Sequence, residues 1–162
     1  PDAVLRSSGP LPEAMREIVR DHADYGARLV ADADEPRLVQ AVAAVRHHHE
    51  RFDGSGYPSG LRGQEIPLLA RIVALAESFD AMLQSRPYRS SRTVSKSLEE
   101  IERCAGTQFD PFLAGAFVQL VRRVQREHGD VLEYLGEQAR TNPRVRTFER
   151  LERLMAKSRS TL

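Results

Sequence analysis

Apolar residues in this chain recur every three or four positions, and no stretch alternates between apolar and polar residues as a half-buried strand does. One such series consists of Leu38, Val42, Val45, His48 and His49. Residues three and four apart share one face of a helix, so these two histidines are expected to face inward. A period of 3.6 does not suit a pleated strand, and the sequence therefore predicts an all-α fold.

Local signals divide the chain into separate helices. The predicted helices cover residues 11–30 with a bend near His22, 35–50, 66–84, 97–106 and 110–125, followed by two more separated by breaks at Gly129 and at Asn142-Pro143. Ser97 with Glu100 predicts a capping box, and Asp110 before Pro111 predicts an N-cap. In residues 66–84 the expected buried stripe is Leu69, Ile72, Val73, Ala76 and Phe79.

Composition limits the classes of function. The 162 residues suit one ordinary core, and a formal net charge of +1 gives no overall preference for DNA or for a membrane surface. A single cysteine, Cys104, permits no intrachain disulfide. With no secretory signal and no long apolar segment, the expected location is the cytoplasm.

The histidines and acids suggest metal chemistry. Neutral imidazoles bind zinc, iron and manganese, and phosphodiester cleavage often uses two such ions that activate water. Adjacent residues on a helix point about 100° apart. His48 and His49 are therefore expected to serve two neighbouring ions, or one ion and one phosphate. His22 and an acid from the following helix could complete such a site.

Each of these residues also has a structural explanation. An inward histidine is often a hydrogen-bonded core residue, and Glu77 could pair with Arg71. The glycines between residues 54 and 63 could form an irregular turn. Arg86, Arg89 and Arg92 could form a solvated face, although guanidinium groups also bind phosphate.

Several motifs in order resemble one known family. These are the stretch HHERFDGSGYPSGLRGQEIPLLARIVALAESFDAM, then SRPYR, then GTQFDP. Together they resemble the HD-GYP family of metal-dependent phosphohydrolases over residues 1–124. The resemblance implies an HD-domain-like helical bundle, with residues 125–162 as an additional C-terminal helical segment.

The resemblance implies a function and a set of site residues. The family hydrolyses cyclic di-GMP to the linear dinucleotide or to GMP, using two or three iron or manganese ions. His22, His48 and His49 match its metal ligands, and Glu77 stands where the family has a ligand aspartate. The implied substrate-binding residues are Gly56, Tyr57, Asp80, Arg86 and Arg89.

The family's His-Asp dyad falls before a segment like residues 1–11. The resemblance therefore places no catalytic residue within the 162 residues. We expect this chain alone to be inactive, with partial or absent metal occupancy.

Two other functions stay open. One is a catalytically inactive module that binds cyclic di-GMP, or binds a signalling protein through the Gly56-Tyr57-Pro58 loop. The other is a hydrolase of the same architecture that acts on a different phosphoester. The C-terminal segment is expected to pack onto the domain or to form a homodimer through Phe148, Leu151 and Met155.

Overall fold

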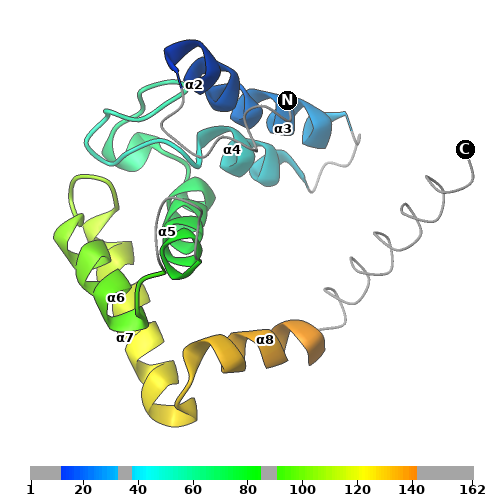
Figure 1. Ribbon diagram of the computed structural model, residues 1–162. Helices are drawn as coiled ribbons and strands as arrows, with labels where there is room; N and C mark the ends of the chain where they lie inside the picture. The colour runs from blue at the N-terminus through cyan, green and yellow to red at the C-terminus, as the bar shows by residue number, and fades with distance from the viewer. Residues whose placement is uncertain (1–11, 33–37, 85–90, 142–162) are drawn as a thin grey trace, which may run out of the picture. The chain divides into compact units, whose positions relative to one another are not determined.

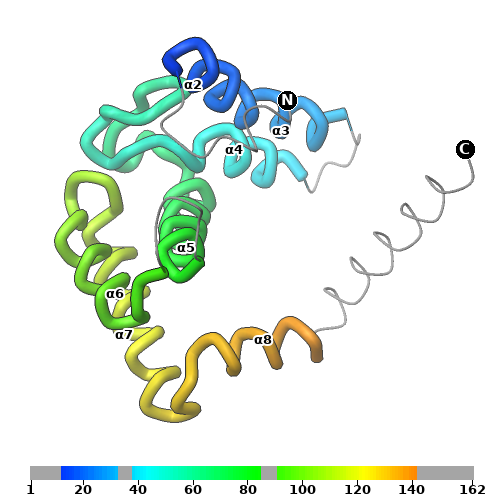
Figure 2. Tube along the Cα trace, in the orientation of Figure 1, coloured from blue at the N-terminus to red at the C-terminus, as the bar shows by residue number. Residues whose placement is uncertain are grey.

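The computed structural model describes residues 12–32, 38–84 and 91–141 (Figures 1 and 2). Its α-helices are α2 (Glu13–Arg20), α3 (His22–Ala31), α4 (Val39–His47), α5 (Leu68–Leu83), α6 (Val94–Arg103), α7 (Pro111–His128) and α8 (Val131–Thr141). A 3₁₀ turn, η2, spans Gly63–Glu65. No strand occurs in these three ranges, where Ala105 and Phe109 form an isolated β-bridge. The predicted all-α fold is confirmed.

The chain divides into two units, Pro1–Val118 and Gln119–Leu162. In the first unit α3 packs on α4, α4 on α5, and α5 on α6, so that α5 lies between α4 and α6 (Figure 1). The second unit contains α8. The predicted division at residues 124 and 125 stays a prediction. The helix predicted through Phe148, Leu151 and Met155 lies outside the described residues.

The core of the first unit comes mainly from α5, α6 and the start of α7. The largest side chains with almost no exposure include Ile66, Leu98, Ile101 and Val118. Phe79 of α5 meets Phe117 of α7 edge to face, with 5.2 Å between ring centroids. These contacts hold α5 in place, and the neighbouring site is built on this helix.

The buried face of α5 differs from the expected stripe. Its buried residues are Ala70, Leu75, Phe79 and Met82. Leu69, Ile72 and Val73 are 40–43% exposed, and only Phe79 belongs to both sets. Residues 68–83 are apolar on nearly every side, so helical spacing alone does not select one face.

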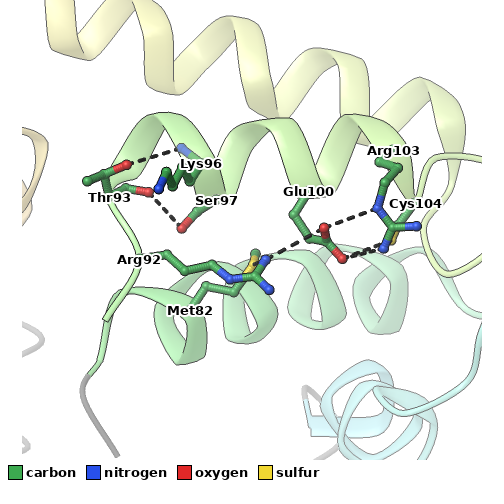
Figure 3. A network of polar contacts seen from close by, with 8 residues as sticks. All are labelled: Met82, Arg92, Thr93, Lys96, Ser97, Glu100, Arg103 and Cys104. Atoms are coloured by element: carbon green, nitrogen blue, oxygen red, sulfur yellow. Dashed lines mark hydrogen bonds and ion pairs between the residues drawn. The ribbon is translucent and has the colours of Figure 1, made fainter. Parts of the chain in front are cut away.

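Helix starts follow local hydrogen bonding. The predicted capping box at Ser97 is wrong, because α6 begins at Val94 with Thr93 as its N-cap. The Thr93 hydroxyl accepts from the backbone N–H of Lys96, and the Ser97 hydroxyl donates to the carbonyl of Thr93 (Figure 3). Ser97 is instead fully buried inside the helix.

Three other predicted boundaries, at His22, Asp110 and Gly129, are confirmed, whereas the predicted break at Asn142-Pro143 lies outside the described residues. The Asp110 carboxylate accepts from the backbone N–H groups of Phe112 and Leu113, as an N-cap does. The bend expected near His22 is the break between α2 and α3.

Across the described ranges, no helix combines the length and the apolar character needed to cross a membrane.

Candidate metal centre and adjoining cavity

Three histidines converge at one point in the first unit. His22 is the first residue of α3, and His48 and His49 directly follow α4. Nε2 of His22 lies 3.1 Å from Nε2 of His49 and 3.3 Å from Nε2 of His48. One nitrogen from each ring lies within 4.8 Å of the other two. This cluster could hold a metal ion.

The backbone fixes the tautomer of two of these rings. Nδ1 of His48 lies 2.6 Å from the carbonyl oxygen of Val45, and Nδ1 of His22 contacts the carbonyl of Val19. A carbonyl only accepts, so each Nδ1 carries the proton and each Nε2 carries a lone pair. Metal-binding histidines commonly donate their other ring N–H in this way. Two lone pairs 3.3 Å apart repel each other unless a cation lies between them. The donor set therefore fits an ion.

Two of the three separations between the nitrogens, those from His22 to His48 and from His22 to His49, suit a single ion. Metal–imidazole bonds of about 2.0–2.1 Å place neighbouring ligand nitrogens roughly 2.9–3.4 Å apart, and the observed 3.1 and 3.3 Å fall in that range. The helix-based expectation was that His48 and His49 diverge too far to share an ion. Because α4 ends at His47, both histidines lie in a turn, where helical spacing no longer applies.

His49 stays neutral at physiological pH. Burial, and then the neighbouring charges of His48 and His22, lower the pKa of His49 to about 4. The ring of Tyr57 lies against it, with 4.8 Å between ring centroids and a tilt of 30°. A neutral imidazole keeps the lone pair that a metal ion needs.

A cavity of about 360 Å³ lies beside the histidines. The residues that line it are His48, His49, Glu50, Arg51, Ala74, Glu77, Ser78, Ala81 and Gln108. Glu77 is half-exposed, and its Oε2 lies 3.8 Å from Nε2 of His48. A carboxylate therefore stands at the edge of the histidine cluster, within reach of the same ion or of a molecule in the cavity.

Glu50 holds the glycine-rich loop in place. Its buried carboxylate accepts hydrogen bonds from the backbone N–H groups of Ser59 at 2.7 Å and of Leu61 at 3.2 Å. His47 contacts the same carboxylate at 3.4 Å. The sequence analysis assigned no role to Glu50, although its position directly after the two histidines was a usable signal.

Gly56 and Tyr57 lie against the histidine segment. A Cβ at Gly56 would come within 2.3–2.6 Å of backbone atoms of His49, Glu50 and Arg51, so only glycine fits. The backbone N–H of Tyr57 donates to the carbonyl of His49 at 3.3 Å. Burial, and then the charge of Glu77, raise the pKa of the Tyr57 hydroxyl. The loop thus packs against His49 and helps to hold it in position.

The structure does not bring every predicted residue to the cavity. Asp80 is exposed and accepts a hydrogen bond from Gln84 at 2.5 Å, and it is absent from the lining of the cavity. Arg86 and Arg89 lie outside the described residues. Arg71 does not pair with Glu77, since it contacts Asp110 at 2.5 Å.

The lining residues that the sequence analysis did not assign also include Arg51 and Gln108. Arg51 presents a guanidinium that also contacts Ser55 at 2.9 Å and Asp53 at 3.3 Å. Gln108 comes from the segment between α6 and α7 and contacts the Ser78 hydroxyl at 3.5 Å. The packing of α6 beside α5 brings Gln108 there, and its place in the GTQFDP motif was a usable signal.

Comparison with known proteins finds one matching family and several similar phosphodiesterases. The HD domain family matches residues 1–113. A cyclic di-GMP phosphodiesterase of Thermotoga maritima is 38% identical over 124 residues, which are 76% of this chain and 34% of that protein. A 3'3'-cGAMP-specific phosphodiesterase 2 of Vibrio cholerae is 36% identical over 114 residues, 70% of this chain and 22% of that protein.

A solved structure supports the fold. The crystal structure of a cyclic GMP-AMP-specific phosphodiesterase of V. cholerae matches 89% of this chain and 34% of its own, with a TM-score of 0.57 and 20% identity. The helical arrangement is therefore that of an HD-type domain. The chain spans about a third or less of the length of each of these proteins.

Proposed function

This chain belongs to the HD domain family and is of the HD-GYP type, and from that premise we propose that it is a metal-dependent phosphodiesterase domain acting on cyclic di-GMP. The observation that carries the proposal is the convergence of three histidine Nε2 atoms beside a cavity of about 360 Å³. The products would be the linear dinucleotide or GMP.

The residues of the cluster and the neighbouring carboxylate would act as metal ligands. His22, His48 and His49 would hold a divalent ion, with Glu77 as the acidic ligand. Mixed imidazole and carboxylate donors suit manganese or iron, with two or three ions in the complete site. Such ions supply positive charge for the phosphate oxygens and lower the pKa of water.

The chain's own side chains would position the substrate. Arg51 lines the cavity and carries a fixed positive charge that attracts a phosphate group. In the hydrolysis, a water oxygen bonds to phosphorus, the ester P–O bond breaks, and the leaving oxygen takes up a proton. Tyr57, packed on His49, limits the access of solvent to that side of the imidazole.

The test measures metal content and hydrolysis in the same samples. The protein that carries this chain is loaded with manganese or iron and incubated with cyclic di-GMP, and chromatography detects the products. We expect His48→Ala combined with His49→Ala to lose both metal and product. The matched control is His128→Ala, which removes an imidazole on α7 outside the cluster and should change neither.

Two outcomes would contradict the proposal. Unchanged metal content in the double variant would show that the histidines are not ligands. Bound metal and bound nucleotide without any product would indicate a binding module in place of an enzyme.

A further inference from the structure

A second cavity, of about 240 Å³, adjoins the first. Its lining residues are Ser78, Ala81, Met82, Arg92, Glu100, Gln108 and Phe109. Ser78, Ala81 and Gln108 line both cavities, so the two cavities lie next to each other along these residues. A molecule that fills the first cavity can therefore extend toward the second.

Helix α5 forms the wall along which such a molecule would lie. Ala74 and Glu77 line the first cavity, and Met82 lines the second. At 1.5 Å per residue, Ala74 and Met82 are separated by about 12 Å along the helix. A ligand with a phosphate in the first cavity would thus have a neighbouring group within reach of Met82.

The lining of the second cavity combines apolar surfaces with a charged edge. Met82 and Phe109 are buried and form part of the apolar wall of the cavity. Arg92 and Glu100 are about one third exposed and offer charge. A nucleobase has apolar faces, which suit an apolar wall, and a polar edge, which forms hydrogen bonds with a charged side chain such as Arg92. The cavity matches both features.

Arg92 is held at this edge by its backbone and by its side chain, whose contact with Glu100 is drawn in Figure 3. Its N–H donates to the carbonyl of Met82 at 2.8 Å, which ties it to the end of α5. Its Nη1 lies 3.6 Å from Glu100 and 3.7 Å from the Met82 sulfur. These contacts are long, so they restrain the guanidinium without consuming its hydrogen-bonding capacity.

Glu100 is engaged mainly by a different arginine. Arg103 donates to its two carboxylate oxygens at 2.5 and 3.1 Å (Figure 3). Those hydrogen bonds lower the pKa of Glu100, which stays negatively charged at neutral pH. Compared with Glu100, Arg92 therefore has more hydrogen-bonding capacity left for a ligand.

We propose that the second cavity receives the second base of a cyclic dinucleotide and that Arg92 selects guanine there. The inference rests on the proposed function and concerns specificity. Guanine presents two acceptors, N7 and O6, that match a guanidinium, whereas adenine replaces O6 with an amino donor. Relatives of this chain include phosphodiesterases named for cyclic di-GMP and for 3'3'-cGAMP, two substrates that differ in one base.

The experiment measures relative affinity, so it needs no turnover. Non-hydrolysable phosphorothioate analogues of cyclic di-GMP and of 3'3'-cGAMP are titrated by calorimetry into the manganese-loaded protein. We expect a preference for the cyclic di-GMP analogue of about tenfold, within the range that one arginine–guanine contact provides. Arg92→Gln should abolish or reverse this preference, because glutamine pairs with adenine, while Arg92→Lys should retain part of it.

The matched control is Lys96→Gln, which removes a positive charge from α6 at an exposed position outside the lining of the cavity. It should leave the ratio of the two affinities unchanged. An unchanged ratio in Arg92→Gln would overturn the inference while leaving the proposed function intact. Failure of the parent protein to bind either analogue would overturn the proposed function, and the inference with it.

Discussion

At the scale of single residues, Gly56 shows how tightly the loop is packed against the histidines. The atoms that a Cβ would meet are the backbone nitrogen of Arg51 at 2.3 Å, Cα of Glu50 at 2.5 Å and the carbonyl oxygen of His49 at 2.6 Å. Backbone atoms cannot rotate away as a flexible side chain can. The position therefore excludes every side chain and couples the loop to the segment that carries His48 and His49.

We predict that Gly56→Ala destabilises the protein. Overpacking of this kind costs about 1–3 kcal/mol, and urea denaturation would measure the loss. The matched control is Gly115→Ala in α7, where a Cβ would meet no atom within 4 Å. Alanine there should stabilise the helix by roughly 0.5–1 kcal/mol. Equal stability of the two variants would contradict the packing argument.

At the scale of elements, the pair formed by Arg71 and Asp110 joins the start of α5 to the start of α7. Arg71 donates to Asp110 at 2.5 Å and to the carbonyl of Ile66 at 2.9 Å. The other oxygen of Asp110 caps α7. Burial acts to raise the pKa of Asp110, but the hydrogen bonds from Leu113, Arg71 and Phe112 outweigh it and lower the pKa.

We predict that Asp110→Ala costs about 3–5 kcal/mol, because it removes the cap and leaves the largely buried Arg71 unpaired. Asp110→Asn should cost about 1 kcal/mol less, because asparagine also caps helices. Thermal or urea unfolding at pH 7 would measure both variants. If alanine and asparagine were equivalent, the capping role would be excluded.

The same pair predicts a dependence of stability on pH. Because the pKa of Asp110 is lower in the folded state, its contribution is complete above the ordinary value of 3.8 and is lost as the pH falls through the folded value. The stability difference between the parent protein and Asp110→Asn should therefore shrink below about pH 4. A constant difference between pH 7 and pH 3 would contradict this linkage.

At the scale of the whole molecule, the histidine cluster ties the start of α3 to the end of α4. His22 and His48 are 26 positions apart in the sequence. An ion bound to both would cross-link the two segments in the folded state only, and folding would gain the free energy of binding.

We predict that manganese stabilises the protein and that a chelator reverses the effect. At one hundred times the dissociation constant, binding adds about 2.7 kcal/mol, which corresponds to roughly 5–10 °C in Tm for a chain of this size. His22 is exposed, so His22→Ala should leave the Tm of the metal-free protein nearly unchanged while removing most of the shift. A full shift in that variant would exclude His22 as a ligand.

The sequence by itself determined the helical fold, the break at His22, the N-cap at Asp110 and the three histidines as a group. Each of these depends on neighbours within a few positions, because helical period, capping and residue chemistry are local properties. The motifs also determined the family, because several motifs in a fixed order are specific where a single one would not be.

Only the tertiary structure decided how those residues meet. It turned His48 and His49 toward one point after α4 had ended, placed Ala70 and Leu75 instead of Leu69 and Ile72 in the core, and paired Arg71 with Asp110. It also brought Gln108 and Arg92 to cavities lined by α5. The physical reason is that these outcomes depend on which helices pack together, and a helix such as α5, with apolar residues on nearly every side, carries no local signal for that choice.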